Sequence, residues 1–172
     1  MPYLKCSSCG SRTYIVSEGT CPSCGTALRR TSPPAGPRSV ADEQIRTKLG
    51  VAMRELRADT ALLTEVRDGH EHIRWQAGSG PYVGHSVPLA QTICERLLSG
   101  RIDSVVSDVR NEPALHGVQA GDVRAYIGVP FTTADARAYV LCCLAHEVRP
   151  DLGTADVRFL EGIVESLRQA LK

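Results

Sequence analysis

The sequence predicts an α+β domain over residues 39–172, in which terminal helices pack on an antiparallel sheet, preceded by a small metal-bound module. Along the larger part, the order of segments is helix, hairpin, helix, strand, hairpin, helix, which suits a sheet covered by helices. Four of the seven cysteines lie in the first 24 residues, ahead of residues 31–38, which contain three prolines and a glycine. That composition is typical of a stiff, extended linker. We therefore divide the chain into residues 1–30, 31–38 and 39–172.

Length and charge exclude several classes of protein. A chain of 172 residues is too short for a large multi-domain enzyme, and 42% hydrophobic residues are enough for a packed core. Twenty basic and nineteen acidic residues give a net charge of +1, which attracts neither nucleic acid nor an anionic membrane. No apolar run reaches the roughly 20 residues that a membrane span needs, and the N-terminus lacks a signal-peptide pattern. We expect a cytoplasmic protein with no membrane partner.

Residues 1–30 contain two CxxC pairs that are separated by eleven residues, and a glycine follows each pair. A CxxC turn directs backbone amides toward two thiolates, and the following glycine supplies the left-handed conformation that such a turn needs. Two turns together offer four sulfur ligands in a tetrahedron. Because so short a segment buries too little surface to fold alone, a bound metal would supply most of its folding free energy. We predict a metal site formed by Cys6, Cys9, Cys21 and Cys24.

This N-terminal module resembles a zinc ribbon, and we predict Zn²⁺ as its cofactor. Its CxxCG and CPxCG knuckles also resemble those of rubredoxin-type iron domains, and tetrahedral sulfur ligation permits both metals; iron would make the module an electron carrier. Residues 1–38 carry five basic residues and one acidic residue, a net charge of +4, against −3 for the remainder. Four thiolates and one zinc ion contribute about −2, which leaves a weak field for phosphate. We expect no nucleic-acid partner.

The first elements of the larger part are a helix and a hairpin. Ser39 is placed to cap a helix with Asp42 three residues on. Residues 60–67 and 70–77 flank Asp68-Gly69, a dipeptide that favours a two-residue hairpin turn, and we predict an antiparallel pair there. The helix has one apolar face, because its apolar residues recur at helical spacing: Ile45, Leu49, Ala52 and Leu56.

The remaining elements follow from proline, glycine and apolar runs. We predict a helix over residues 88–99 with proline in its first turn, a short strand over 102–106, and a loop with one helical turn over 111–121. Apolar runs at 125–132 and 137–145 predict two strands covered on both faces. The last helix begins near residue 154 and carries a heptad seam: Val157, Leu160, Val164, Leu167 and Leu171.

Four sequence motifs of residues 39–172 are informative because of the order in which they occur. They are VPLAQTICERLL at 87–98, Ser107-Asp108 with Glu112-Pro113 after it, RAYIGVPF at 124–131, and LCCLAHEVRP at 141–150. In this order they resemble a GAF domain, the small-molecule sensing and dimerising module of many bacterial signalling proteins. Ala136 and Val140 depart from the resemblance, because they stand where the family commonly has glycine.

The resemblance implies a GAF-like sheet with the terminal helices on one face and a ligand-type cavity on the other. The roof would be residues 81–94 and 105–123, and the floor residues 73–76, 126–130 and 140–144. Aromatic rings, hydrogen-bonding groups and thiols suit a small-molecule site. The candidate pocket residues that the resemblance implies are Trp75, Tyr82, His85, Cys94, Asp108, His116, Tyr126 and Cys142.

Each candidate also has a purely structural interpretation. Trp75 and Tyr126 could pack in the core, and Asp108 could cap its loop by accepting backbone amides. Free cysteine commonly serves as a small buried apolar residue. Cys142 and Cys143 are adjacent in a strand and point to opposite faces, so a redox pair would need Cys94 with one of them.

The sequence contains no phosphate-cradling loop, no GxSxG elbow, no HExxH and no paired carboxylates in an apolar setting, so we predict a protein that is not an enzyme. The leading hypothesis is a cytosolic bacterial sensor, a zinc ribbon joined to a GAF domain that forms a homodimer through its terminal helices and signals to a partner protein. The alternatives are a thiol- or iron-based redox sensor, and an interaction or transcription-regulatory adaptor with a closed cavity.

Overall fold

The chain divides into two compact units, Met1–Arg38 and Ser39–Lys172. The computed structural model describes residues 39–80 and 82–171, and the backbone of four short strands nearer the N-terminus. In the first unit, β1 (Tyr3–Lys5) pairs with β2 (Arg12–Tyr14), and β3 (Gly19–Thr20) pairs with β4 (Ala27–Leu28), both antiparallel. The four predicted metal ligands, Cys6, Cys9, Cys21 and Cys24, lie outside the described residues.

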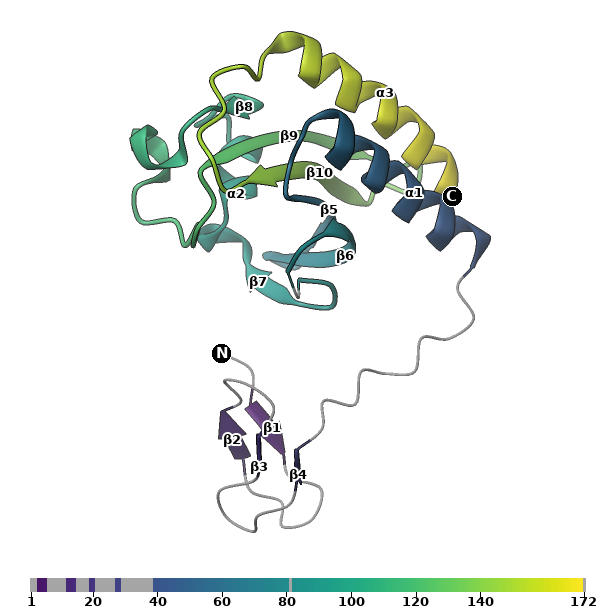
Figure 1. Cartoon of the computed structure of the whole chain (residues 1–172). Helices are drawn as coiled ribbons and strands as arrows, with labels where there is room; N and C mark the ends of the chain where they lie inside the picture. Colours follow the sequence, from purple (N-terminus) through teal and green to yellow (C-terminus); the bar gives the residue numbers. More distant parts are fainter. Residues whose placement is uncertain are drawn as a thin grey trace. The chain divides into compact units, whose positions relative to one another are not determined.

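The second unit is built on a six-stranded antiparallel sheet, in the order β7-β6-β5-β10-β9-β8 (Figure 1). Strands β5 and β10 occupy its centre and are buried along most of their length, because elements cover both faces of the sheet there. The predicted α+β fold class is confirmed. The strands are β5 (Thr60–Arg67), β6 (His70–Gly78), β7 (Ser86–Pro88), β8 (Val105–Val106), β9 (Ala125–Thr132) and β10 (Ala138–Ala145).

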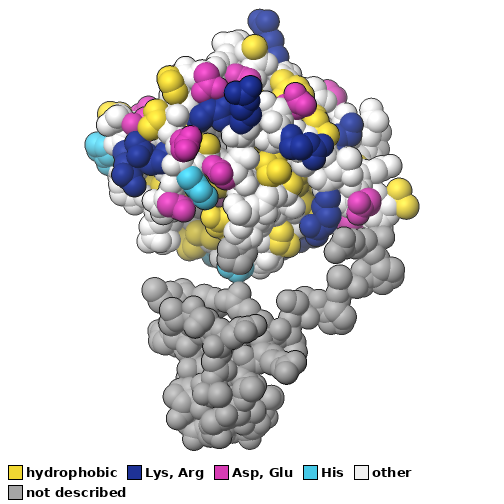
Figure 2. Space-filling view, in the orientation of Figure 1, with side chains coloured by type: hydrophobic (Ala, Val, Ile, Leu, Met, Phe, Trp, Pro, Cys, Tyr) yellow, Lys and Arg dark blue, Asp and Glu magenta, His cyan; other side chains and the backbone are white. Residues whose placement is uncertain are grey.

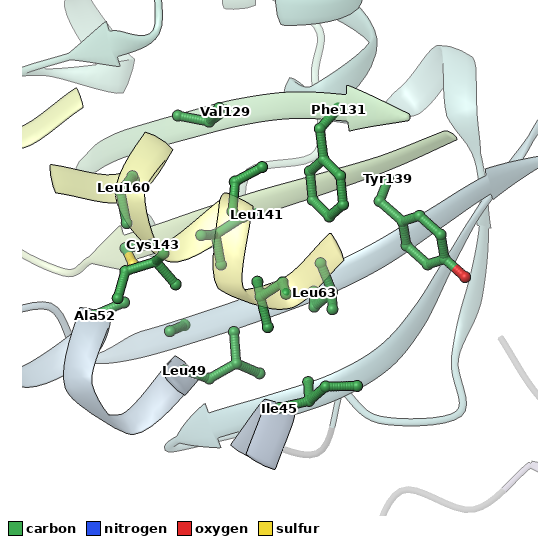
Figure 3. Close-up of a cluster of buried hydrophobic side chains, with 14 of the residues drawn as sticks. Ile45, Leu49, Ala52, Leu63, Val129, Phe131, Tyr139, Leu141, Cys143 and Leu160 are labelled. Carbon is green, nitrogen blue, oxygen red and sulfur yellow. The ribbon is translucent and has the colours of Figure 1, made fainter. Parts of the chain in front are cut away.

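Two long helices, α1 (Val40–Glu55) and α3 (Thr154–Ala170), lie side by side on one face of this sheet (Figure 1). The predicted cap of α1 is confirmed, because Ser39 Oγ accepts from the Asp42 amide and the Asp42 carboxylate accepts from the Ser39 amide. Figure 3 shows the core between the helices and the sheet, where Leu49, Leu63 and Leu160 are fully buried. We call this side the helix face.

The apolar face of α1 and the heptad seam of α3 are both used in this intrachain contact. Ile45, Leu49 and Ala52 of α1 and Leu160, Val164 and Leu167 of α3 belong to the same buried cluster as the central strands. A dimer through these helices would therefore have to use their outward surfaces. In the face that Figure 2 shows, basic and acidic side chains of the described residues are interspersed.

The opposite face of the sheet, which we call the cavity face, is covered by shorter elements. They are 3-10 turns at Leu89–Gln91, Val109–Asn111 and Pro113–Leu115, and the six-residue helix α2 (Ile93–Leu98). Here the prediction of one helix over 88–99 is wrong, because Pro88 ends β7 and Thr92 is extended and begins a new helix by accepting from the Glu95 amide. The strand predicted over 102–106 is reduced to β8.

The hairpin between β9 and β10 explains one departure from the GAF pattern. Ala136 adopts a φ of 62°, in the left-handed region that glycine favours. The alanine at this turn therefore keeps the backbone conformation that a glycine would provide. None of the helices in the described part of the chain is long and apolar enough to cross a membrane.

Candidate functional site

A cavity of about 380 Å³ lies on the cavity face of the sheet. Its floor comes from β5, β6, β9 and β10, and its walls come from the segment that runs from the β6–β7 loop to α2 and from residues 119–123. Most of its lining is apolar, and the polar groups converge from several elements. The lining residues are Leu62, Glu71, Ile73, Tyr82, His85, Val87, Gln91, Thr92, Ile93, Cys94, Gln119, Ala120, Gly121, Asp122, Val123, Tyr126, Cys142 and Leu144.

The β6–β7 loop is held over the cavity by the side chain of Gln76. Its Nε2 donates to the carbonyls of Ser79 (2.9 Å) and Gly80 (2.5 Å), and its Oε1 accepts from the Tyr82 amide (3.1 Å). Gly80 has a φ of 101°, and a Cβ there would clash with the Tyr82 ring, lying 2.8 Å from Cδ2 and closer still to Cε2. The absence of a side chain at Gly80 thus lets the Tyr82 ring fold back toward the cavity.

On the floor, Tyr126 and Gly128 act as a pair. Both lie on β9, two residues apart and so on the same face of the sheet. A Cβ at Gly128 would lie 2.7 Å from Cζ of Tyr126, so the tyrosine ring lies along the strand over the glycine. This arrangement brings the Tyr126 hydroxyl under α2, where its oxygen lies 3.5 Å from Cys94 Sγ.

A small polar cluster is buried at the junction of β6, α2 and β9. Cys94 Sγ donates to Glu71 Oε1 at 3.3 Å and also contacts the Tyr126 hydroxyl. A thiol has one proton. Since Cys94 gives that proton to the carboxylate, the Tyr126 hydroxyl donates to the sulfur. The resulting chain of donors runs from Tyr126 through Cys94 to Glu71.

The surroundings of this cluster keep its thiols protonated. The pKa of Cys94 is raised well above its ordinary value by the neighbouring Cys142 thiol, by burial and by the negative charges around it. Burial is the largest cause of a raised pKa at Tyr126. On the opposite face of the sheet, burial also raises the pKa of Cys143 to about 12. Reactive cysteines have a lowered pKa, because the thiolate is the nucleophile. The raised pKa values of these cysteines therefore make them poor nucleophiles.

Glu71 has no cationic partner in the described part of the chain. Its exposed fraction is 6%, and its one hydrogen-bond donor there is the Cys94 thiol. Glu65, which is 4% exposed and lies on the helix face, differs because Arg74 and Arg67 approach its carboxylate at 3.5 and 4.0 Å. Burying a carboxylate without a cation is costly, and such groups concentrate at functional sites.

Five of the eight predicted pocket residues line this cavity, and they come from three separate parts of the chain. Cys94, Tyr126 and Cys142 form its inner part, while His85 is exposed at its edge and Tyr82 is half-buried. Cys142 and Cys143 face opposite sides of the sheet, as predicted, because they belong to different buried clusters. The five are Tyr82, His85, Cys94, Tyr126 and Cys142.

The other three, Trp75, Asp108 and His116, lie outside the cavity. A β-bulge at Arg74 reverses the side to which Trp75 points, so its ring packs on the helix face and its Nε1 donates to Asp42 (2.8 Å). Asp108 caps the turn at Val109–Asn111 by accepting from the Arg110 amide, its alternative role in the sequence analysis. His116 is exposed after the turn at Pro113–Leu115.

Glu71 lies outside the predicted roof and floor, whereas Gln91, Thr92, Gln119 and Asp122 lie within the predicted roof segments but were not among the named candidates. Glu71 could have been found, because it lies two residues from Ile73, which was assigned to the floor, and alternate residues of a strand share a face. The loop residues carry no comparable periodic signal. Among the described residues, no group of three or more His, Cys, Asp or Glu side chains could hold a metal ion.

No family model and no curated protein matches the chain. Solved structures do. The GAF domain of an Acinetobacter phosphoenolpyruvate-protein phosphotransferase matches with a TM-score of 0.63 and 13% identity, over 76% of this chain and 81% of that chain. A phycocyanobilin-bound GAF domain from a cyanobacterial phytochrome gives 0.62 and 14%, over 76% and 84%. At such low identities, the likeness shows that residues 39–172 have the GAF fold.

An enzyme has the same fold. The free methionine-R-sulfoxide reductase from Neisseria meningitidis, in complex with its substrate, matches with a TM-score of 0.61 and 14% identity, over 76% of this chain and 77% of that chain. The fold is therefore compatible with both sensory and catalytic proteins, and the site residues have to decide between them.

Proposed function

We propose that the chain is a non-enzymatic cytoplasmic signalling protein, whose GAF-like domain senses a small molecule held in the cavity between β6, β9 and α2. The observation that carries this proposal is the cavity itself. Its volume of about 380 Å³ lies within the range of ligand pockets, and apolar walls with a few convergent polar groups are the usual composition of such sites. Two of the solved structures with this fold hold a small molecule, a phycocyanobilin and a substrate.

The polar cluster supports binding rather than catalysis. A nucleophile needs a base within reach, and an acid-base catalyst needs a group that exchanges protons with the ligand. Cys94 instead donates to Glu71 and has a raised pKa. Raised thiol pKa values also disfavour the thiol redox sensor, and a cavity of this size disfavours an adaptor whose GAF domain is closed.

The proposal is tested on the full chain. Native mass spectrometry of protein purified from its host should reveal a bound small molecule, and that molecule should raise the melting temperature of the stripped protein by mass action. Ala120→Trp, at a half-buried position on the cavity wall, should abolish this shift. Ala134→Trp, on the exposed β9–β10 turn, is the matched control. A ligand shift that survives in Ala120→Trp would refute the cavity as the site.

We further propose that Cys6, Cys9, Cys21 and Cys24 bind one zinc ion in a ribbon. In the sequence, each CxxC pair follows a strand that pairs with the next strand, β1 with β2 and β3 with β4, which supports a two-hairpin ribbon. Cys6→Ser or Cys21→Ser should release the metal while the melting transition of the GAF-like domain stays unchanged. Elemental analysis distinguishes zinc from iron, and an unchanged metal content would refute the site.

The signal requires an output, and we propose a homodimer through the outward surfaces of α1 and α3 together with a partner protein. Val40, at the start of α1, is 76% exposed, although it is apolar. The side-by-side arrangement of the two helices offers a continuous surface to a second copy. Sedimentation equilibrium tests the dimer, and a monomer at high protein concentration would refute it.

A further inference from the structure

We propose that the cavity selects a small organic cation, with the Glu71 carboxylate as its counter-ion; this inference rests on the proposed sensing function. A protein rarely buries a carboxylate without a positive partner, because the loss of hydration costs several kcal/mol. Glu71 lines the cavity, and only 6% of its surface is exposed. Its hydrogen-bond donor among the described residues is a neutral thiol. The missing positive charge is then supplied by the ligand.

The charges of the lining agree with this sign. Among the described residues that line the cavity, Glu71 and Asp122 are the acids, His85 is the one histidine, and there is no lysine or arginine. A phosphate or carboxylate ligand would meet a buried negative charge without compensation, which makes the site repulsive to anions. A ligand with an ammonium, amidinium or guanidinium group would instead be attracted by this negative charge.

The two acids of the lining differ in exposure. The side chain of Asp122 is 75% exposed and lies 3.6 Å from Nε2 of His146, so solvent and this neighbour weaken its attraction for a cation. Glu71 is buried at the inner end, where the same charge acts in a lower dielectric. The rings of Tyr82 and Tyr126 also line the cavity, and aromatic faces attract cations through their quadrupoles.

Cys94 and Tyr126 position the carboxylate. The Cys94 thiol fixes Oε1 of Glu71 at 3.3 Å, and the second oxygen has no donor in the described part of the chain. One carboxylate oxygen is therefore held in place while the other can accept from a ligand. Charge-assisted hydrogen bonds of this kind are about twice as strong as neutral ones.

The test uses the full chain and three probes of nearly the same size and shape: benzamidinium, benzamide and benzoate. Near neutral pH they differ in charge, as cation, neutral amide and anion. Titration calorimetry or saturation-transfer NMR should give the order benzamidinium, benzamide, benzoate. The cation should bind at least about tenfold more tightly than the amide, because a hydrogen bond to a charged group is stronger than one to a neutral group.

Three variants locate the source of this preference. Glu71→Gln keeps size and hydrogen-bonding capacity and should abolish the preference for benzamidinium over benzamide. Asp122→Asn should reduce it by no more than about twofold, because the exposed charge is screened. Glu65→Gln, which removes a buried carboxylate from the helix face, should leave it unchanged.

The outcomes separate this inference from the proposed function. Equal binding of benzamidinium and benzamide, or a preference that survives in Glu71→Gln, would overturn the cation site and leave a neutral-ligand sensor standing. If none of the three probes binds, and Ala120→Trp changes no ligand response, both proposals are overturned.

Discussion

The two faces of the central sheet are covered in different ways, and that difference separates stability from function in this protein. On the helix face, α1 and α3 run for 16 and 17 residues and close a dense core (Figure 3). On the cavity face, a six-residue helix, 3-10 turns and loops cover the strands and leave a cavity of about 380 Å³. Long amphipathic helices fill the space above a sheet, whereas short elements joined by turns leave gaps.

Neighbouring residues on one strand therefore have different surroundings. Leu63 is fully buried under the helices, while Leu62, the residue before it, lines the cavity. The two buried glutamates differ in the same way, since Glu65 is paired with arginines and Glu71 is not. The packing element above each face, and not the strand sequence alone, decides which role a residue has.

The largest expected effect tests this difference at the two leucines of β5. Leu63→Ala leaves a void in a close-packed core and should lower the free energy of unfolding by about 3–4 kcal/mol. Leu62→Ala enlarges an existing cavity and should cost about 2 kcal/mol, mainly the loss of buried apolar surface. Denaturant unfolding of both variants measures the difference. Equal costs would mean that the two faces are packed equally well.

A second effect concerns the cavity floor. Gly128→Ala places a methyl group against the Tyr126 ring and should destabilise the protein by about 1–3 kcal/mol, because an overpacked core forces side chains to move. In the background of Tyr126→Leu, which removes the ring, the same change should cost much less. The non-additivity of this double-mutant cycle is the measurement. Additive costs would show that the ring does not occupy the space above Gly128.

The two glutamates give effects of opposite sign. Glu65→Gln weakens its contacts with Arg67 and Arg74 and should destabilise the protein by about 1 kcal/mol, since both arginines are half-exposed. Glu71→Gln removes a buried charge without a cationic partner and should be neutral or stabilising by about 1 kcal/mol. Both values come from chemical denaturation in the absence of ligand. A large loss of stability in Glu71→Gln would contradict the functional interpretation of this carboxylate.

Elements with a strong periodic signal could be predicted from the sequence. The cap of α1 follows from Ser39 with Asp42, and the seam of α3 follows from heptad spacing. Strands β9 and β10 follow from apolar runs. The helix predicted over 88–99 was interrupted because Thr92 offers its own capping hydroxyl, a local competition that hydrophobic spacing does not reveal.

The candidate site was less predictable, because its residues depend on register. Period-two alternation puts Ile73 and Trp75 on the same side of β6, whereas one extra residue at the bulge places them on opposite sides. The GAF resemblance located the cavity lining at Tyr82, Cys94 and Tyr126, but not the unpaired charge of Glu71. A bulge and a missing counter-ion are properties of the folded sheet, and neither has a one-residue signature.

The bulge also supplies the smallest effect, which is a pH dependence on the helix face. Because Trp75 points to that face, its Nε1 donates to Asp42, and this hydrogen bond, followed by that from Ser39, lowers the pKa of the Asp42 carboxyl below its ordinary value of 3.8. A lowered pKa contributes stability above the ordinary value that is lost as the pH falls through the lowered one. The contribution of one such hydrogen bond is about 1 kcal/mol or less.

Trp75 is the single tryptophan of the chain, so its fluorescence should change as the pH falls below about 4. Asp42→Asn keeps an acceptor for the indole but does not titrate, and it should remove this change; the same pH profile in both proteins would show that Trp75 does not contact Asp42.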